Sequence, residues 1–379
     1  MTMSPLAAVS GLRSPTLEFD LILDGVRAFR RHELDPLAAR PEFVPDPDQI
    51  VEVTRAARDH GLVGEDASPL WAGTTGDDVA LTLASLVLLA EAQAGLAFHL
   101  HQLALTGLLA RYTGTALAPG TVPALEGAGG LARGALARLL TGTAPTGEDE
   151  ALLAAEHPAG DDGVVLLQAT EPWTHVLLPR YLGAGALALA VVDRDATAAT
   201  PLGAGHGLDG VRWWQLRVPR GAGTVVAEDT TARTAIRTAL TATALALPTI
   251  GLGTLVGTWA RVWPYSGDRV QGGHPIREHP AVAQLLAEAR STIALARAAL
   301  ARPPALESFD GLVEAIALRA GLHPPLCAAA TALVQVLGGY GYMRDQGAEA
   351  CLRDNQHLRL SNGAPSQLAL FLIAAEELR

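Results

Sequence analysis

Few side chains of this chain have the type and spacing that common catalytic motifs require. The 28 basic residues are all arginine, so neither a Schiff-base lysine nor a lysine base is available. His99 and His101 lie two positions apart, which places them on different faces of a helix, and we expect no metal pair there. The sequence contains no H-E-x-x-H, G-x-S-x-G or Walker motif. We therefore expect no bound metal, and any chemistry must come from another arrangement.

Composition and charge favour a globular protein with a small-molecule partner. The net charge of −11 argues against a nucleic acid or an anionic membrane surface as partner. Cys327 and Cys351 form no C-x-x-C pair, so we expect two buried free thiols and no disulfide framework. The N-terminus lacks a basic start followed by an apolar core, so we expect no signal peptide and a cytoplasmic location.

The segment Thr238–Ala260 is uncharged and long enough to be considered as a membrane span. Its threonines and glycines make it less uniformly apolar than a spanning helix. Gly253 and Gly257, one helical turn apart, would let another backbone come close. We expect a helix buried in a bundle, and no membrane contact.

Hydrophobic periodicity divides the chain into three parts. Residues 1–145 are typical of helices, and Ala80–Tyr112 suits a helical hairpin in the core. Residues 146–230 contain short apolar and β-branched runs between turns, which predicts a small β domain. From 231 to 379 the helical period returns, and this order indicates an α+β arrangement. The expected strands are 163–168, 175–178, 186–192, 211–218 and 224–227, and the expected breaks in the last part are 264–280, 303–304 and 323–325.

Two C-terminal segments carry a more specific pattern. The run Q-V-L-G-G-Y-G-Y from Gln335 leads to Arg353-Asp354, and the run R-V-Q-G-G-H-P-I starts at Arg269. They resemble the Q-x-x-G-G-x-G-Y…R-D signature and the R-x-Q-F-G-x-P-I segment of the acyl-CoA dehydrogenase family. Residues 61–76 resemble the lead-in of the same family. The resemblance implies an N-terminal helical domain (1–145), a central small β domain (146–230) and a C-terminal four-helix bundle (231–379).

The resemblance also implies FAD as cofactor and a homodimer or homotetramer. Arg269 and Gln271 would reach the cofactor pyrophosphate across a dimer interface, where an arginine fork suits phosphate oxygens. In place of the aromatic residue, this chain has Gly272. A second set of residues would bring the backbone close to the diphosphate: Gln335, Gly338, Gly339 and Gly341. The alternatives are a surface loop and a helix-ending turn.

Trp173-Thr174-His175 resembles the family's W-I-T, which packs against the flavin ring and hydrogen-bonds its N5. His175 takes the place of the threonine, and a histidine can donate the same bond and titrate near neutral pH. The alternative is a core tryptophan beside a surface histidine. Thr143–Asp149 is the degraded candidate for the family's T-E-P-x-x-G-S-D loop, which contributes to flavin and thioester binding.

Asn362 is the position where the chain departs from the family pattern. The family's best-known members carry the catalytic glutamate eight residues after the aspartate of the R-D pair, where this chain reads N-G-A-P. Removal of an α-proton while a hydride goes to flavin N5 needs a carboxylate, and an amide is no base. The family's other base position falls at about Thr243, with no acid nearby. The remaining candidates, each with a surface or core role as alternative, are His357, Glu349, His175, His99 and His101.

Three functions therefore stay open. The first is an FAD-dependent oxidoreductase on an acyl thioester of coenzyme A or a carrier protein, or on a related small molecule in secondary metabolism, with a relocated or absent base. The second is a flavin-dependent monooxygenase of the same fold, which requires no α-proton base. The third is a cofactor-free lyase or cyclase, or a non-catalytic relative.

Overall fold

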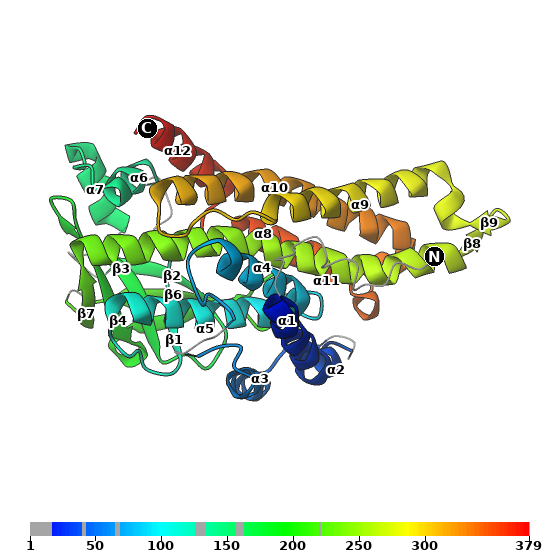
Figure 1. Ribbon diagram of the computed structural model, residues 1–379, viewed down its shortest axis with the longest axis horizontal. Helices are drawn as coiled ribbons and strands as arrows, with labels where there is room; N and C mark the ends of the chain where they lie inside the picture. Colours follow the sequence, from blue (N-terminus) through cyan, green and yellow to red (C-terminus); the bar gives the residue numbers. More distant parts are fainter. Residues whose placement is uncertain are drawn as a thin grey trace.

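The computed structural model describes residues 17–39, 43–64, 69–125, 133–156, 163–219 and 221–378. Long helices form an elongated body, and a small β domain lies at one end of it (Figure 1). The described N-terminal helices are α1 (Leu17–Phe29), the π-helix η2 (Arg30–Leu34), α2 (Asp35–Ala38), α3 (Pro47–Asp59), α4 (Gly76–Ala90) and α5 (Ala94–Thr113).

Helices α4 and α5 form the expected core hairpin. Almost every side chain of α4 from Val79 onward is buried, which explains why apolar residues surround this helix on all sides. Helix α5 starts where the Gln93 side chain accepts a hydrogen bond from the Leu96 N–H. It ends at Gly114, whose φ of 63° is the left-handed conformation that glycine adopts at low cost.

The β domain consists of two sheets around their own core. One sheet has the order β1-β3-β4-β7 and the other β2-β6-β5. All five expected strands are confirmed, and the three-residue β1 and the seven-residue β5 are additional. The strands are β1 (Thr121–Pro123), β2 (Gly163–Ala169), β3 (His175–Gly183), β4 (Ala186–Asp193), β5 (Ala198–Ala204), β6 (Arg212–Val218) and β7 (Thr224–Glu228).

The boundary at residue 146 differs from the expectation. Strand β1 already pairs with β3, and the helices α6 (Arg133–Thr141) and α7 (Gly147–Glu156) come between β1 and β2 in the sequence. The Arg138 fork joins this pair by donating to both oxygens of Asp149, at 2.8 and 2.7 Å. Thr143–Asp149 therefore leads into α7 and forms its first turn, because Asp149 also accepts bonds from Thr146. As folded, this segment is a helix start, not a cofactor loop.

The C-terminal bundle is built on one long helix. Helix α8 (Asp229–Asp268) runs along the molecule and contacts α9 (Pro280–Leu300), α10 (Phe309–Leu337) and α11 (Ala348–Leu360) (Figure 1). The hairpin β8 (Val270–Gln271) and β9 (His274–Pro275) joins α8 to α9, and α12 (Pro365–Glu376) packs on α6 and α10.

Two features of these helices test the sequence expectations. A Cβ on Gly253 would lie 2.6 Å from the Val87 carbonyl oxygen, and one on Gly257 would lie 2.5 Å from that of Glu91, so the expected close approach is confirmed. Helices α8 and α10 are both long and apolar enough to cross a membrane, but the most apolar window of α8 is fully buried. The expected break at 323–325 is wrong: α10 continues through Pro324 and Pro325, since its packing outweighs the lost hydrogen bonds.

Candidate active site and cofactor segments

The two positions that the resemblance assigns to a base lie in one pocket. Asn362, at the corner between α11 and α12, and Thr243, in the middle of α8, both line it. Its volume is about 20 Å³, which is room for about one water molecule. The other lining residues come from α5, the end of β1, β2, α8 and the same corner: Phe98, His101, Gln102, Leu105, Pro123, Leu125, Gln168, Leu247 and Ser361.

Arg319 holds the corner that carries Asn362. This side chain of α10 is 1% exposed, and its guanidinium donates to the carbonyl oxygens of Asn362 and Gly363 at 3.0 Å and also to that of Ser361. Asn362 has a φ of 49°, in the left-handed region that asparagine tolerates better than most side chains. An asparagine here therefore has a backbone reason as well as a chemical consequence.

None of the described residues that line this pocket is an acid. Its one titratable group is His101, whose Nδ1 accepts a hydrogen bond from Trp71 Nε1 at 3.0 Å. The ring proton of the neutral imidazole must then sit on Nε2, which lies 3.5 Å from the Thr243 hydroxyl. Burial lowers the pKa of His101 to about 3, so this side chain is a neutral hydrogen-bond donor and a poor base.

Two buried amides complete the pocket, and sequence reasoning missed both. Gln102 Nε2 donates to the Gln168 carbonyl oxygen at 2.6 Å, and Ser361 Oγ donates to Gln168 Oε1 at 3.0 Å. Gln102 Oε1 and Gln168 Nε2 have no hydrogen-bond partner in the described structure. The pocket thus offers one free acceptor and one free donor, both uncharged. The available signal was a glutamine inside each of two otherwise apolar segments.

The other candidate bases do not line this pocket. His99 lies between the hydroxyls of Thr54 and Thr170, at 2.7 and 2.6 Å, and burial lowers its pKa to about 4. Glu349 accepts a hydrogen bond from Arg353 at 2.6 Å. His357 stacks on Trp213, and burial lowers its pKa to about 4. None of these residues lies where an acyl α-proton would be removed from a substrate beside Asn362.

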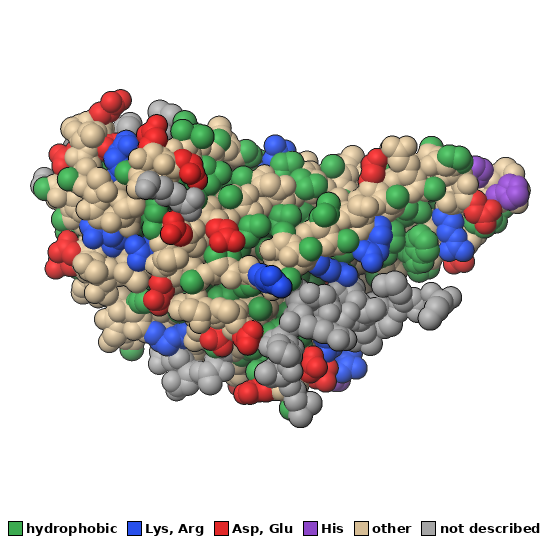
Figure 2. All heavy atoms as spheres, turned by 45° about the horizontal axis from the view of Figure 1, so that its top comes forward, with side chains coloured by type: hydrophobic (Ala, Val, Ile, Leu, Met, Phe, Trp, Pro, Cys, Tyr) green, Lys and Arg blue, Asp and Glu red, His purple; other side chains and the backbone are tan. Residues whose placement is uncertain are grey.

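The expected diphosphate contacts lie toward the same end of the bundle. Arg269 ends α8 and Gln271 lies in the β8–β9 hairpin, and the turn η6 (Gly338–Tyr342) follows α10. The rings of Tyr265 in α8 and Tyr340 in η6 meet at 6.5 Å. Figure 2 shows histidine and arginine side chains at this narrow end, with apolar side chains behind them. The exposed residues here include Arg269, Gln271, Gln335, Gly338 and Gly339.

These residues fit a diphosphate, with one exception. In the described structure the Arg269 guanidinium has no ion pair, and a Cβ added to Gly338 or Gly339 would meet nothing within 4 Å. Backbone and guanidinium are therefore free to meet phosphate oxygens. The exception is Gly341, which is buried, and whose Cβ would lie 2.1 Å from the Val334 carbonyl oxygen. Gly341 serves close packing within the turn, not access to a ligand.

Trp173, unlike the diphosphate residues, is not placed to contact a flavin ring. Trp173 is 1% exposed, meets Trp214 edge-on at 5.7 Å, and lies under the Arg194 guanidinium. It fills the core of the β domain, so the alternative interpretation of this tryptophan is the observed one. Thr174 donates to the Pro119 carbonyl oxygen at 2.7 Å, and His175 contacts Asp193 at 3.6 Å near the surface.

The two expected halves of the cofactor site lie at opposite ends of α8. The β domain precedes this helix and the β8–β9 hairpin follows it (Figure 1). A helix of 40 residues is about 60 Å long at 1.5 Å per residue. One cofactor can therefore meet both halves only if the hairpin end belongs to a second copy of the chain.

Comparison with known proteins agrees with this architecture. Residues 233–376 match the family model described as acyl-CoA dehydrogenase, C-terminal domain. A segment of 137 residues is 31% identical to cyclohexane-1-carbonyl-CoA dehydrogenase of Geobacter metallireducens. The C-terminal bundle is thus similar to the acyl-CoA dehydrogenase family. The matched segment is 35% of this chain, and it spans 36% of the relative's length.

Solved structures of this family and of related oxidases share the whole fold. Butyryl-CoA dehydrogenase from Megasphaera elsdenii superposes with a TM-score of 0.69 at 17% identity, over 97% of this chain and 100% of the other. A prolyl acyl carrier protein oxidase gives 0.69 at 14% identity, over 96% and 100%. The acyl-CoA dehydrogenase fold predicted from the sequence is thus confirmed: helical domain, small β domain and helical bundle.

Proposed function

We propose that this protein is a member of the acyl-CoA dehydrogenase family and an FAD-dependent oxidoreductase that acts on an acyl thioester, of coenzyme A or a carrier protein, or on a related small molecule. The observation that carries the proposal is the free, exposed set of Arg269, Gln271, Gln335 and the Gly338–Gly339 backbone at one end of the bundle. Retaining an unpaired guanidinium beside an open glycine backbone suits a bound diphosphate.

FAD supplies a hydride acceptor when it is bound. The residues of the Asn362 pocket supply hydrogen bonds without charge: Asn362 and Gln168 offer amide groups, and His101 directs its Nε2 proton toward Thr243. None of them removes an unactivated α-proton. The proton must therefore go to a base outside this pocket or to water, which favours a C–H or N–H bond more acidic than that of a simple saturated acyl thioester.

A second candidate is oxygenation by the same fold. It is favoured by the acid-free lining of the described pocket, because an oxygen-transfer reaction requires no carboxylate at Asn362 or Thr243. The side chains that would orient a substrate are the same uncharged amides.

The absorbance spectrum of the purified protein is the first test. A flavin spectrum, as purified or after addition of FAD, is the expected result, and its absence would leave only a cofactor-free role. Anaerobic bleaching by a thioester would then support dehydrogenation. Oxygen uptake that requires reduced flavin would support oxygenation.

The same proposal requires an oligomer, a homodimer or homotetramer. Large apolar side chains are exposed at the hairpin end, namely Trp263, Val270, Tyr340, Tyr342 and Met343. A second copy would cover them and bring Arg269 to the other chain's flavin-ring segment. Light scattering at micromolar concentration should give at least twice the chain mass, and a monomer would contradict the proposed shared site.

A further inference from the structure

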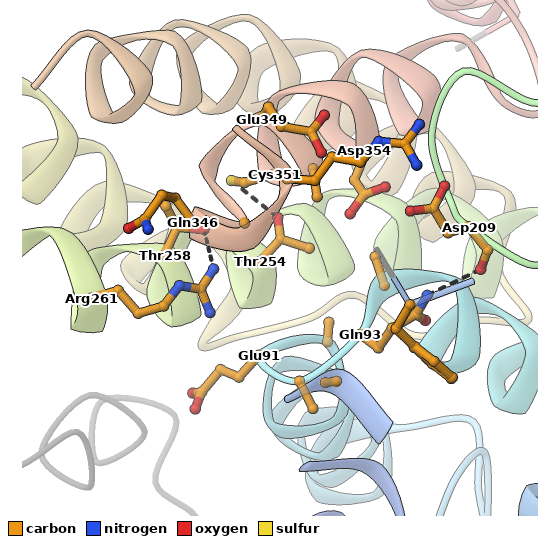
Figure 3. Close-up of a pocket in the computed structure, with 18 of the residues that line it drawn as sticks. Glu91, Gln93, Asp209, Thr254, Thr258, Arg261, Gln346, Glu349, Cys351 and Asp354 are labelled. Atoms are coloured by element: carbon orange, nitrogen blue, oxygen red, sulfur yellow. Dashed lines mark hydrogen bonds between the residues drawn. The ribbon is translucent and has the colours of Figure 1, made fainter. Parts of the chain in front are cut away.

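A second, larger cavity lies at the opposite end of α11 from Asn362. Its volume is about 480 Å³, within the range of small-molecule sites. It is enclosed by α8, the first half of α11, the α4–α5 corner, the segment around Arg30 and the loop at Asp209 (Figure 3). Nothing in the proposed flavin chemistry uses this cavity.

One end of the cavity has an excess of carboxylates. The Arg353 guanidinium donates to Asp209 at 3.1 Å and to Glu349 at 2.6 Å, so two carboxylates already share its one charge. Asp354 is a third, 8% exposed, and accepts a hydrogen bond from the Leu208 N–H at 2.7 Å. Burial, and then the charge of Asp209, raises the pKa of Asp354 to about 7. This end lacks a cation.

The other end has an arginine without an acid. Arg261 lies against Gly347, the residue before α11, and among the described residues its guanidinium has the Thr258 hydroxyl, at 3.3 Å, as its one hydrogen-bond partner. No described carboxylate is within ion-pair distance of Arg261 or of Arg344, which also lines the cavity. Arg261 is exposed and lines the cavity, so its guanidinium is open to an anion at this end.

A buried oxygen on the cavity wall is also incompletely bonded. Glu91 has a side chain that is 6% exposed, and its Oε2 accepts from Arg30. Its Oε1 is buried and has no partner among the described residues. Buried polar atoms normally find a partner, in the protein or in a bound molecule.

The spacing of the two ends follows from α11. Gly347, beside Arg261, and Asp354 are seven residues apart, which is about 10 Å along a helix. Figure 3 shows Arg261 on one side of the cavity, and Asp354 and Asp209 on the other.

We propose that this cavity binds a small zwitterion, with its ammonium group at Asp354 and Asp209 and its carboxylate at Arg261. Such a molecule supplies the missing cation at one end and the missing anion at the other. The spacing suits a chain of about six carbons, counting the carboxylate carbon. The site is separate from the pocket at Asn362 and requires no flavin.

Titration calorimetry of the purified full-length protein tests this assignment with three probes of equal chain length. We expect 6-aminohexanoate to bind best, hexylamine at least tenfold more weakly, and hexanoate more weakly still. Hexanoate binding as well as 6-aminohexanoate, or no heat from 6-aminohexanoate at millimolar concentration, would overturn the proposal. Because these probes are neither thioesters nor flavins, the outcome is independent of the proposed oxidoreductase activity.

Two substitutions locate the site. Asp354→Asn keeps an acceptor for the Leu208 N–H but removes the charge, and Arg261→Gln removes the anion-binding group. Each should weaken 6-aminohexanoate at least tenfold, and only Arg261→Gln should leave hexylamine unaffected. The controls Asp48→Asn and Arg55→Gln remove the same charges from exposed sites on α3, and should change nothing. If a correctly folded Asp354→Asn, verified by its melting curve, bound 6-aminohexanoate like the wild type, the proposal would fail.

Discussion

The hairpin end of the bundle and the pocket at Asn362 have diverged in opposite ways from the pattern that both resemble. At the hairpin end, Arg269 and the Gly338–Gly339 backbone are exposed and free of ion pairs. At the pocket, Asn362 and Thr243 replace the two possible bases, and about 20 Å³ of space is left.

The contrast concerns two separate tasks, binding a cofactor and removing a proton. Diphosphate contacts act on the part of a cofactor remote from the reacting bonds, so they can persist while the chemistry at the ring changes. The residue at a base position cannot be replaced in the same way, because an amide in place of a carboxylate ends proton abstraction. We propose from this contrast that the hairpin end holds the cofactor and that the pocket does not desaturate a simple saturated acyl thioester.

The largest expected effect concerns the pocket. The native protein should show negligible desaturation of butyryl-CoA or octanoyl-CoA, since a missing base costs about 10²- to 10⁴-fold in rate. Asn362→Glu should restore part of that rate if FAD and thioester bind. Its gain should grow with rising pH, because burial in an uncharged pocket raises the pKa of a carboxyl group.

Reduction of an artificial electron acceptor measures both rates, and Asn362→Gln is the matched control that lengthens the side chain without adding a base. Ordinary dehydrogenase rates in the wild type would mean that another residue is the base. His175 and Glu349 would then be substituted first.

The next effect concerns the residue that positions the pocket corner. Arg319→Met removes the donor to three carbonyl oxygens and leaves them buried. We expect a loss of roughly 3–5 kcal/mol in the free energy of unfolding. Urea unfolding measures it, with exposed Arg290→Met on α9 as control. A loss below 1 kcal/mol, equal to the control, would show that the corner does not depend on Arg319.

Asp354, on the helix that precedes Asn362, gives a pH-dependent effect. Its pKa is raised to about 7 in the fold, above the 3.8 of an ordinary aspartate, so burial of its charge opposes folding as the pH rises from about 4 to about 7. Asp354→Asn removes that penalty while keeping an acceptor for Leu208. The variant should gain stability relative to the wild type across this window, by at most roughly 4 kcal/mol. Urea unfolding at pH 5 and pH 8 should show the larger difference at pH 8, and equal differences would refute the assignment.

The sequence predicted the architecture well, because its signals were local or fixed by spacing. Alternating apolar runs predict five strands, which the structure contains, and this signal is periodicity that a single chain displays directly. The positions of Asn362 and Thr243 follow from the resemblance, by counting from the family's motifs, and both residues line one pocket.

What the sequence did not predict depends on packing between distant segments. Trp173 is buried because Trp214 and Arg194 enclose it, and Gly341 is constrained by the Val334 carbonyl. Gln102 and Gln168, each with one amide atom that has no partner in the described structure, meet only after α5 and β2 come together. None of these contacts has a local signal, so a motif match alone assigned Trp173 and Gly341 to the cofactor.

The smallest expected effect tests the hairpin end. Arg269→Ala should weaken FAD binding by roughly 1–3 kcal/mol, the range for one charge-assisted hydrogen bond, because no described residue competes for its guanidinium. Quenching of flavin fluorescence measures the affinity, and Arg290→Ala, which removes a surface arginine from α9, should leave it unchanged.

Mixing Arg269→Ala with a chain altered at Thr174 and His175 tests whether the site is shared. If the flavin-ring segment of one chain and the hairpin of another form one site, a mixed dimer keeps one intact site of its two, and the mixed dimer, once separated from the unmixed ones, should bind half of the wild-type flavin. If Arg269→Ala bound FAD with unchanged affinity, the cofactor would lie elsewhere. The contrast between a retained cofactor end and an altered pocket would then no longer hold.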